Sequence, residues 1–78
     1  FIINASSYEK SNLSNSSLQI GDVFMTDFND SNIQNSNFRD MMFVDTDFTH
    51  ANLNDSGFVE IDWHGDNKME CIKNQICE

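Results

Sequence analysis

A bulky apolar residue recurs at every fifth position of the stretch Thr46-Asp47-Phe48-Thr49-His50-Ala51-Asn52-Leu53-Asn54-Asp55-Ser56-Gly57-Phe58. The spacing extends without exception from Ile3 to Trp63, and we call the 13 residues at this position centres. Only 38% of the chain is hydrophobic, so chance would produce such a run with a probability on the order of a few in a million. A period of five fits neither a helix nor a strand. It predicts a chain that turns a corner after every five residues.

The residues next to each centre follow a rule of their own. Two positions before the centre the residue is small in ten of 13 cases, as at Ser31 and Ala51. One position before the centre it is Ser, Asn or Asp in ten of 13 cases, as at Asn32 and Asn52. We expect these polar side chains to hold turns, because they bond to nearby backbone and tolerate tight bends. The centre and the small residue should both point into a narrow interior.

This pattern resembles that of the pentapeptide-repeat family, whose motif is A(N/D)LXX. The segment Ala51-Asn52-Leu53-Asn54-Asp55 matches the motif in full, and Ser31-Asn32-Ile33 and Thr46-Asp47-Phe48 match it with conservative substitutions. The resemblance covers residues 1–65, about five-sixths of the chain. It implies an all-β fold, a right-handed quadrilateral β-helix of about three coils. Four five-residue sides would make one coil, and successive coils would stack about 4.8 Å apart.

Residues that lie 20 positions apart should then stack into ladders in the core. The sequence supports this expectation, because one side would be wholly aromatic and the next wholly aliphatic. The four expected core ladders are Tyr8, Phe28 and Phe48; Leu13, Ile33 and Leu53; Leu18, Phe38 and Phe58; and Ile3, Val23, Phe43 and Trp63.

One side of the expected solenoid, which we call the apolar side, breaks the rule; it comprises residues 1–5, 21–25, 41–45 and 61–65. The three large residues found at the small position, Phe1, Met41 and Ile61, all belong to it. Three interpretations are open: flanking sequence or the C-terminal segment packs on this side, a partner protein or second copy binds there, or the exposure is tolerated. Outward-facing apolar residues form the candidate interaction surface: Ile2, Phe24, Met25, Met42 and Val44, with Ile20 at the adjoining corner.

Residues 66–78 leave the five-residue phase and form a separate C-terminal segment, either a cap or the start of a following segment. Asp66 can serve as an N-cap, and Met69, Ile72 and Ile76 have helical spacing. We therefore predict a short α-helical cap that closes the last coil against Trp63. Cys71 and Cys77 would lie on different faces of this helix, so we expect free thiols.

Composition and spacing argue against several functional classes. A net charge of −9 with only four basic residues disfavours direct nucleic-acid binding, and no apolar run approaches the roughly 20 residues of a membrane span. His64, Cys71 and Cys77 lack the spacing of a zinc site. Flat solenoid sides should offer no pocket. We expect no catalytic, cofactor-binding or metal-binding residues, and hence no enzyme.

We therefore expect a non-catalytic interaction module, a rigid solenoid that presents one face to a protein partner or flanking domain, or to a second copy in a homodimer. Because the sequence begins at Phe1 rather than Met, we expect it to be one module of a larger protein. We also expect that protein to be bacterial. The resemblance also implies two family roles, secreted effectors and DNA mimics that act on type II topoisomerases. The mimic is the alternative function, although the acidic residues form no single long stripe here.

Overall fold

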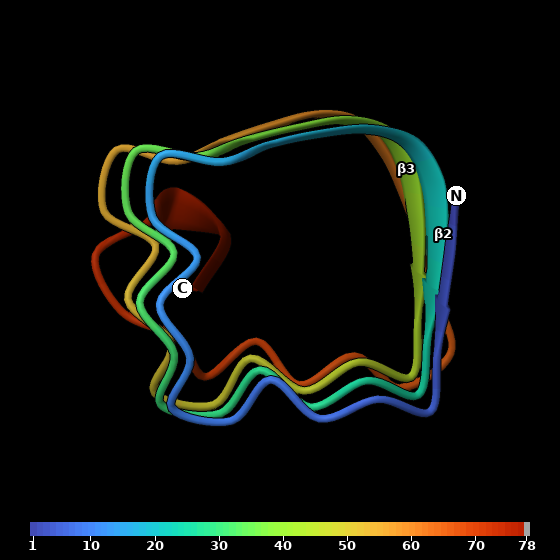
Figure 1. Ribbon diagram of the computed structural model, residues 1–78, viewed down its shortest axis with the longest axis horizontal. Coiled ribbons are helices and arrows are strands. Elements are labelled where there is room, and N and C mark those ends of the chain that lie inside the picture. Colours follow the sequence, from blue (N-terminus) through green and yellow to red (C-terminus); the bar gives the residue numbers. More distant parts are fainter. Residues whose placement is uncertain (78) are drawn as a thin grey trace.

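The computed structural model describes residues 1–77, which wind into a β-solenoid of square cross-section (Figure 1). The strands β1 (Ile2–Asn4), β2 (Ser17–Phe24), β3 (Asn37–Val44) and β4 (Gly57–His64) form one parallel sheet in the order β1-β2-β3-β4. Paired strand residues are 20 positions apart, as Val23 and Phe43 are. Four repeats of five therefore make one coil, and about three coils are stacked. The right-handed sense of the coil stays a prediction.

Each corner of the solenoid uses the left-handed backbone region. Residues two positions after the centres, from Ala5 to Glu60, have φ between 46° and 60°. The side chains one position before the centre hold turns on two of the four sides, where each accepts a hydrogen bond from the N–H two residues further on. These residues are Asn12, Asp27, Asn32, Asp47 and Asn52. The other two sides are extended strands, which need no such bond.

The ladders of centres fill the interior of the solenoid. The ring of Phe28 stacks between Tyr8 and Phe48, with centroids 5.5 and 4.9 Å away. Centres in the middle coils are buried, whereas Ile3, Tyr8, Leu13, Leu18 and Phe58 are partly buried and Trp63 is 38% exposed. These outer residues have a stacking neighbour on one side only. The buried centres are Val23, Phe28, Ile33, Phe38, Phe43, Phe48 and Leu53.

Small residues beside the centres link successive coils. The hydroxyl of Ser36 donates to the carbonyl of Leu13 at 3.0 Å and accepts from the amide of Ser16 at 3.1 Å. The Ser56 hydroxyl repeats this arrangement one coil further on, with the carbonyl of Ile33 and the amide of Ser36. A small polar side chain therefore leaves room for the centre and satisfies buried backbone groups.

Residues 66–77 do not form the predicted α-helix. Lys68 pairs with Asp47 and Ile72 with Asn52, so the chain continues the coil along two more sides before the 3-10 helix η1 (Gln75–Cys77) lies over the end of the solenoid (Figure 1). The free amides and carbonyls of the preceding coil give this segment partners that an isolated helix of about 12 residues, marginal in water, would lack. The coil therefore extends past residue 65. Glu78, the last residue of the expected helix, lies outside the described residues.

Cys71 and Cys77 form a disulfide, so the expectation of free thiols is wrong. That expectation depended on an α-helix, and the turn that replaces it brings the two Cα atoms within 5.1 Å. Cys71 is buried, 20 positions after Ala51, and Ile76 packs against the core. The side-chain amide of Asn74 donates to the carbonyls of Leu53 and Ser56. The disulfide thus closes a cap over one end of the core.

Replacing both cysteines, Cys71→Ser with Cys77→Ser, should lower the free energy of unfolding by about 2 kcal/mol, because the open chain regains loop entropy. Urea unfolding under oxidising conditions measures the change. Dithiothreitol should destabilise the unmodified chain by a similar amount and leave the double variant unchanged. Equal unfolding midpoints for the oxidised chain and the double variant would contradict the prediction.

Candidate interaction surface

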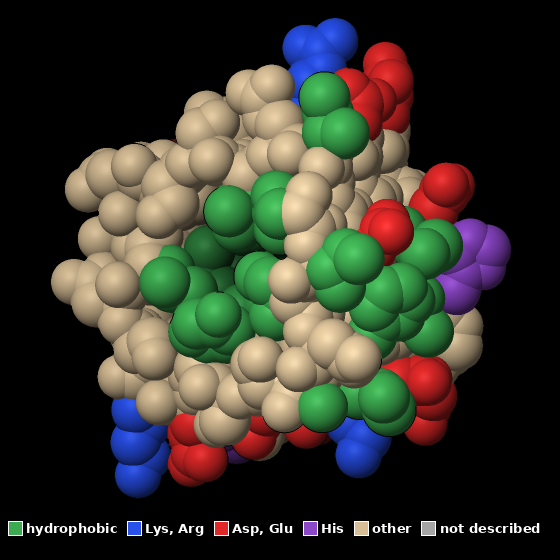
Figure 2. Space-filling view, turned by 45° about the vertical axis from the view of Figure 1, so that its right-hand side comes forward, with side chains coloured by type: hydrophobic (Ala, Val, Ile, Leu, Met, Phe, Trp, Pro, Cys, Tyr) green, Lys and Arg blue, Asp and Glu red, His purple; other side chains and the backbone are tan. Residues whose placement is uncertain are grey.

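The apolar side consists of β1 and the second halves of β2, β3 and β4. Alternation along each strand turns centres such as Phe43 inward and their neighbours outward. The register stacks Phe24 next to Val44, and it places Met42 between Asp22 and Asp62. Figure 2, which brings this flank forward, shows hydrophobic side chains gathered there with carboxylates around them.

The six residues of the candidate interaction surface differ in exposure. Ile2, Ile20 and Met25 are 71%, 72% and 59% exposed. Phe24, Met42 and Val44 are half-buried, because each packs beside residues of the neighbouring strands. Residues 66–77 pair along two other sides of the coil. The described part of the C-terminal segment therefore leaves this surface uncovered.

The large residues at the small position have a packing role that the sequence did not indicate. The ring of Phe1 fills the space that a side chain on Gly21 would need, with ring atoms 2.5–2.7 Å from the site of a Cβ atom. Met41, paired with Gly21 in the next coil, is buried, and Ile61 packs against the core. Met41 and Ile61 therefore fill the interior, whereas Phe1 covers Gly21 and stays 51% exposed at the edge of the apolar side.

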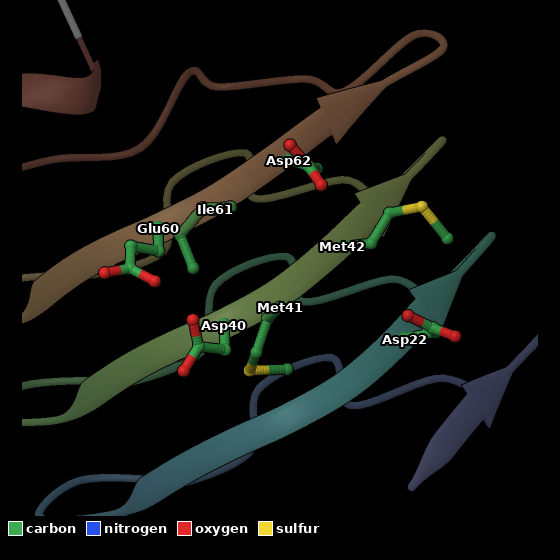
Figure 3. A pocket seen from close by; sticks show the side chains of 7 residues that line it. All are labelled: Asp22, Asp40, Met41, Met42, Glu60, Ile61 and Asp62. Atoms are coloured by element: carbon green, nitrogen blue, oxygen red, sulfur yellow. The ribbon is translucent and has the colours of Figure 1, made fainter.

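A shallow, open groove with a volume of about 490 Å³ lies on the apolar side, so this side is not completely flat. Its floor includes Met42, with Asp22 and Asp62 on the strands to either side (Figure 3). Asp40 and Glu60 stand at the corner where β3 and β4 enter this side. Sequence reasoning missed these four carboxylates as a group, although the predicted 20-residue register already stacks Asp40 on Glu60 and puts Asp22 and Asp62 on either side of one coil.

The carboxylates of the groove have little compensating positive charge. A hydrogen bond with Asp40 and the negative charge of that residue raise the pKa of Glu60, and the positive charge of Arg39 opposes the shift. The Arg39 Nε atom lies 3.8 Å from the Asp40 carboxylate, and both side chains are well exposed. One guanidinium therefore faces a pair of stacked carboxylates, and the groove keeps a negative charge.

Acidic residues on the turn side that carries Tyr8, Phe28 and Phe48 are already used by the fold. The Asp47 carboxylate accepts hydrogen bonds from the amide and hydroxyl of Thr49. Partial burial raises the pKa of Asp47, but these bonds and the charge of Lys68 outweigh it, so the pKa lies below its ordinary value. Asp30 lies 3.6 Å from a ring nitrogen of His50.

The residues considered for a metal site are not brought together. The disulfide occupies Cys71 and Cys77, and no group of three or more His, Cys, Asp and Glu side chains within residues 1–77 is placed to hold a metal ion. Over the same residues, no helix is both long enough and apolar enough to cross a bilayer.

A family model described as Pentapeptide repeats (8 copies) matches residues 26–57. The chain contains pentapeptide repeats. The matched segment includes β3 and most of the buried centres, and in the structure the pentapeptide pattern of centres runs on in both directions, from Ile3 to Trp63. No curated protein matches the chain.

Ile20 combines exposure with an unfavourable backbone conformation, since its φ is 55° and β-branched residues are disfavoured in the left-handed region. Ile20→Asn should raise the free energy of unfolding by about 1 kcal/mol, measured by urea unfolding. The matched control is Asn35→Ile at a corner with the same φ, which should lower stability by a similar amount. An unchanged midpoint for Ile20→Asn would contradict the prediction.

Glu60→Gln should stabilise the folded state at neutral pH, because it removes the repulsion between Glu60 and Asp40. Folding raises the pKa of Glu60, so the contribution of this group to stability is fully present in acid and is lost as the pH rises through the raised pKa. The advantage of Glu60→Gln should therefore shrink as the pH is lowered below the ordinary glutamate range. Thermal unfolding across this range tests the prediction, with Glu9→Gln on another side as the control. An advantage that stays constant with pH would overturn it.

Proposed function

We propose that this pentapeptide-repeat chain is a non-catalytic interaction module that holds its apolar side as a docking face for a protein partner. The observation that carries the proposal is the exposure of Ile2, Ile20 and Met25 together at the apolar side. Val59 and Ile72 are also exposed, but they lie singly on other sides of the coil. Contiguous exposed apolar residues are typical of interaction sites. Stacked repeats also present extended rigid surfaces, which suit this role.

The fold itself does not need apolar residues at these outward positions. The core beneath the surface is closed, since Val23 and Phe43 are each 1% exposed. Outward positions on the opposite side of the coil are polar, as at Gln34 and Asn54, and the repeat is maintained there. The apolar outward residues therefore favour a role in binding over a role in folding.

The alternative function, a DNA mimic that acts on a type II topoisomerase, has less support. Mimicry requires carboxylates that are free to replace phosphates along an extended surface. Asp27 and Asp47 instead accept hydrogen bonds from the backbone of their own turns. The solenoid measures 23 × 22 × 20 Å, and it offers little length for copying a DNA segment.

Photo-crosslinking tests the docking face directly. We expect p-benzoylphenylalanine at Phe24 to form defined protein adducts in cells of the source organism, and the same probe at Gln34 on the opposite side to form none. Met42→Ser combined with Val44→Ser should abolish the Phe24 adducts without unfolding the chain. An adduct of twice the chain mass would identify a second copy as the occupant. No adducts from Phe24, or equal adducts from both positions, would contradict the proposal.

A further inference from the structure

We propose that the segment bound by the apolar side is cationic as well as apolar, a stretch of a partner protein that presents Lys or Arg together with aliphatic residues on one face. This inference rests on the proposed function and names the chemistry of its partner. The apolar side is uncovered and exposes Ile2, Ile20 and Met25. The negative charge around its groove determines which kind of segment can bind there.

The central column of the face alternates between apolar and acidic residues. The register places Ile2, Asp22, Met42 and Asp62 in successive strands. Neighbouring strands lie about 4.8 Å apart, so the two carboxylates are separated by roughly 10 Å with the Met42 thioether between them. Lys and Arg have a matching shape, because their apolar stems pack on hydrophobic surface while the charged head reaches a carboxylate.

The adjoining corner offers a second acidic position. Asp40 and Glu60 occupy equivalent corners of successive coils, and hydrogen bonding with Asp40 and the negative charge of that residue raise the pKa of Glu60. Arg39 reaches Asp40 only at 3.8 Å and at the surface. A guanidinium from a partner can bond two carboxylate oxygens at once. Its charge would also relieve the repulsion between these two side chains.

The same observations disfavour other occupants. An acidic segment or a nucleic acid would meet four carboxylates lining one groove on a chain with a net charge of −9. A cationic segment without apolar residues would leave Ile20 and Met25 in water. A neutral apolar segment would bring groove carboxylates into a drier environment without a partner, which is costly. Only a segment that is both cationic and apolar can pair with the carboxylates and cover the exposed apolar residues.

Fluorescence anisotropy with three short labelled peptides tests the inference on the complete chain. The probe repeats Leu-Leu-Lys-Lys, one control repeats Leu-Leu-Glu-Glu, and the other repeats Ser-Ser-Lys-Lys; we call them the Leu-Lys, Leu-Glu and Ser-Lys peptides. Each face of such an extended peptide carries both of its residue types in alternation. We expect the Leu-Lys peptide to bind, with an affinity that falls as salt is added. Both controls should bind at least about tenfold more weakly.

Matched variants separate the face from bulk charge attraction. Asp22→Asn with Asp62→Asn should weaken Leu-Lys binding by about tenfold. Glu9→Gln with Asp55→Asn removes the same charge from two other sides and should leave binding unchanged. Met42→Ser should weaken binding, whereas Val59→Ser, at an exposed residue outside the apolar side, should not.

Each outcome bears on a different claim. The inference of a cationic partner would be overturned if both double variants weakened binding equally. It would also be overturned if the Leu-Glu peptide bound as tightly as the Leu-Lys peptide. If Phe24 still formed its specific adducts in that case, the docking face would stand and only this inference would fall. If the Phe24 adducts were lost as well, both the docking face and the cationic partner would be contradicted.

Discussion

The spacing that backbone hydrogen bonds impose between coils governs the rest of this structure. Parallel strands lie about 4.8 Å apart, so every inward side chain meets the residue 20 positions away at that separation. Flat aromatic rings suit this distance, and the stacked pairs have centroid distances between 4.7 and 5.5 Å. Like residues therefore stack on like, and the small residue beside each centre keeps the interior narrow enough for close packing.

The four sides meet this constraint in two different ways, and the difference explains where the surface can vary. On two sides, Asn and Asp side chains hold turns, as Asn32 does by accepting a hydrogen bond from the amide of Gln34. On the other two sides the extended chain bonds to its neighbours through the sheet. Outward side chains on these two sides are not needed as hydrogen-bond acceptors for a turn. Ile2 and Met42 can thus occupy a position that is Ser, Asn or Asp on the turn sides, and the apolar side is free to serve in binding.

Much of the fold follows from the sequence, because a strict period of five over 13 centres leaves few architectures. The same pattern placed Ile20, Phe24 and Met42 on one side. It failed at the C-terminus, where Met69, Ile72 and Ile76 have helical spacing but the edge of the preceding coil offers better backbone partners. A signal was available: Cys71 follows Ala51 by 20 positions, in the phase of the small residue. The acidic groove takes four residues from three coils, and the predicted register already aligned them, but the depth of the surface between them depends on side-chain packing that the pattern does not specify.

The position of Trp63 gives the domain an optical property of its own. It is the only tryptophan in the chain, and it ends a column in which its ring stacks on Phe43 with centroids 5.0 Å apart. One face of the indole is held by the core, while 38% of the residue remains in contact with solvent. Its fluorescence therefore reports on the last coil separately from the rest. Fraying at that end would shift the emission to the red before the inner coils open, so one intrinsic signal distinguishes loosening of the end from global unfolding.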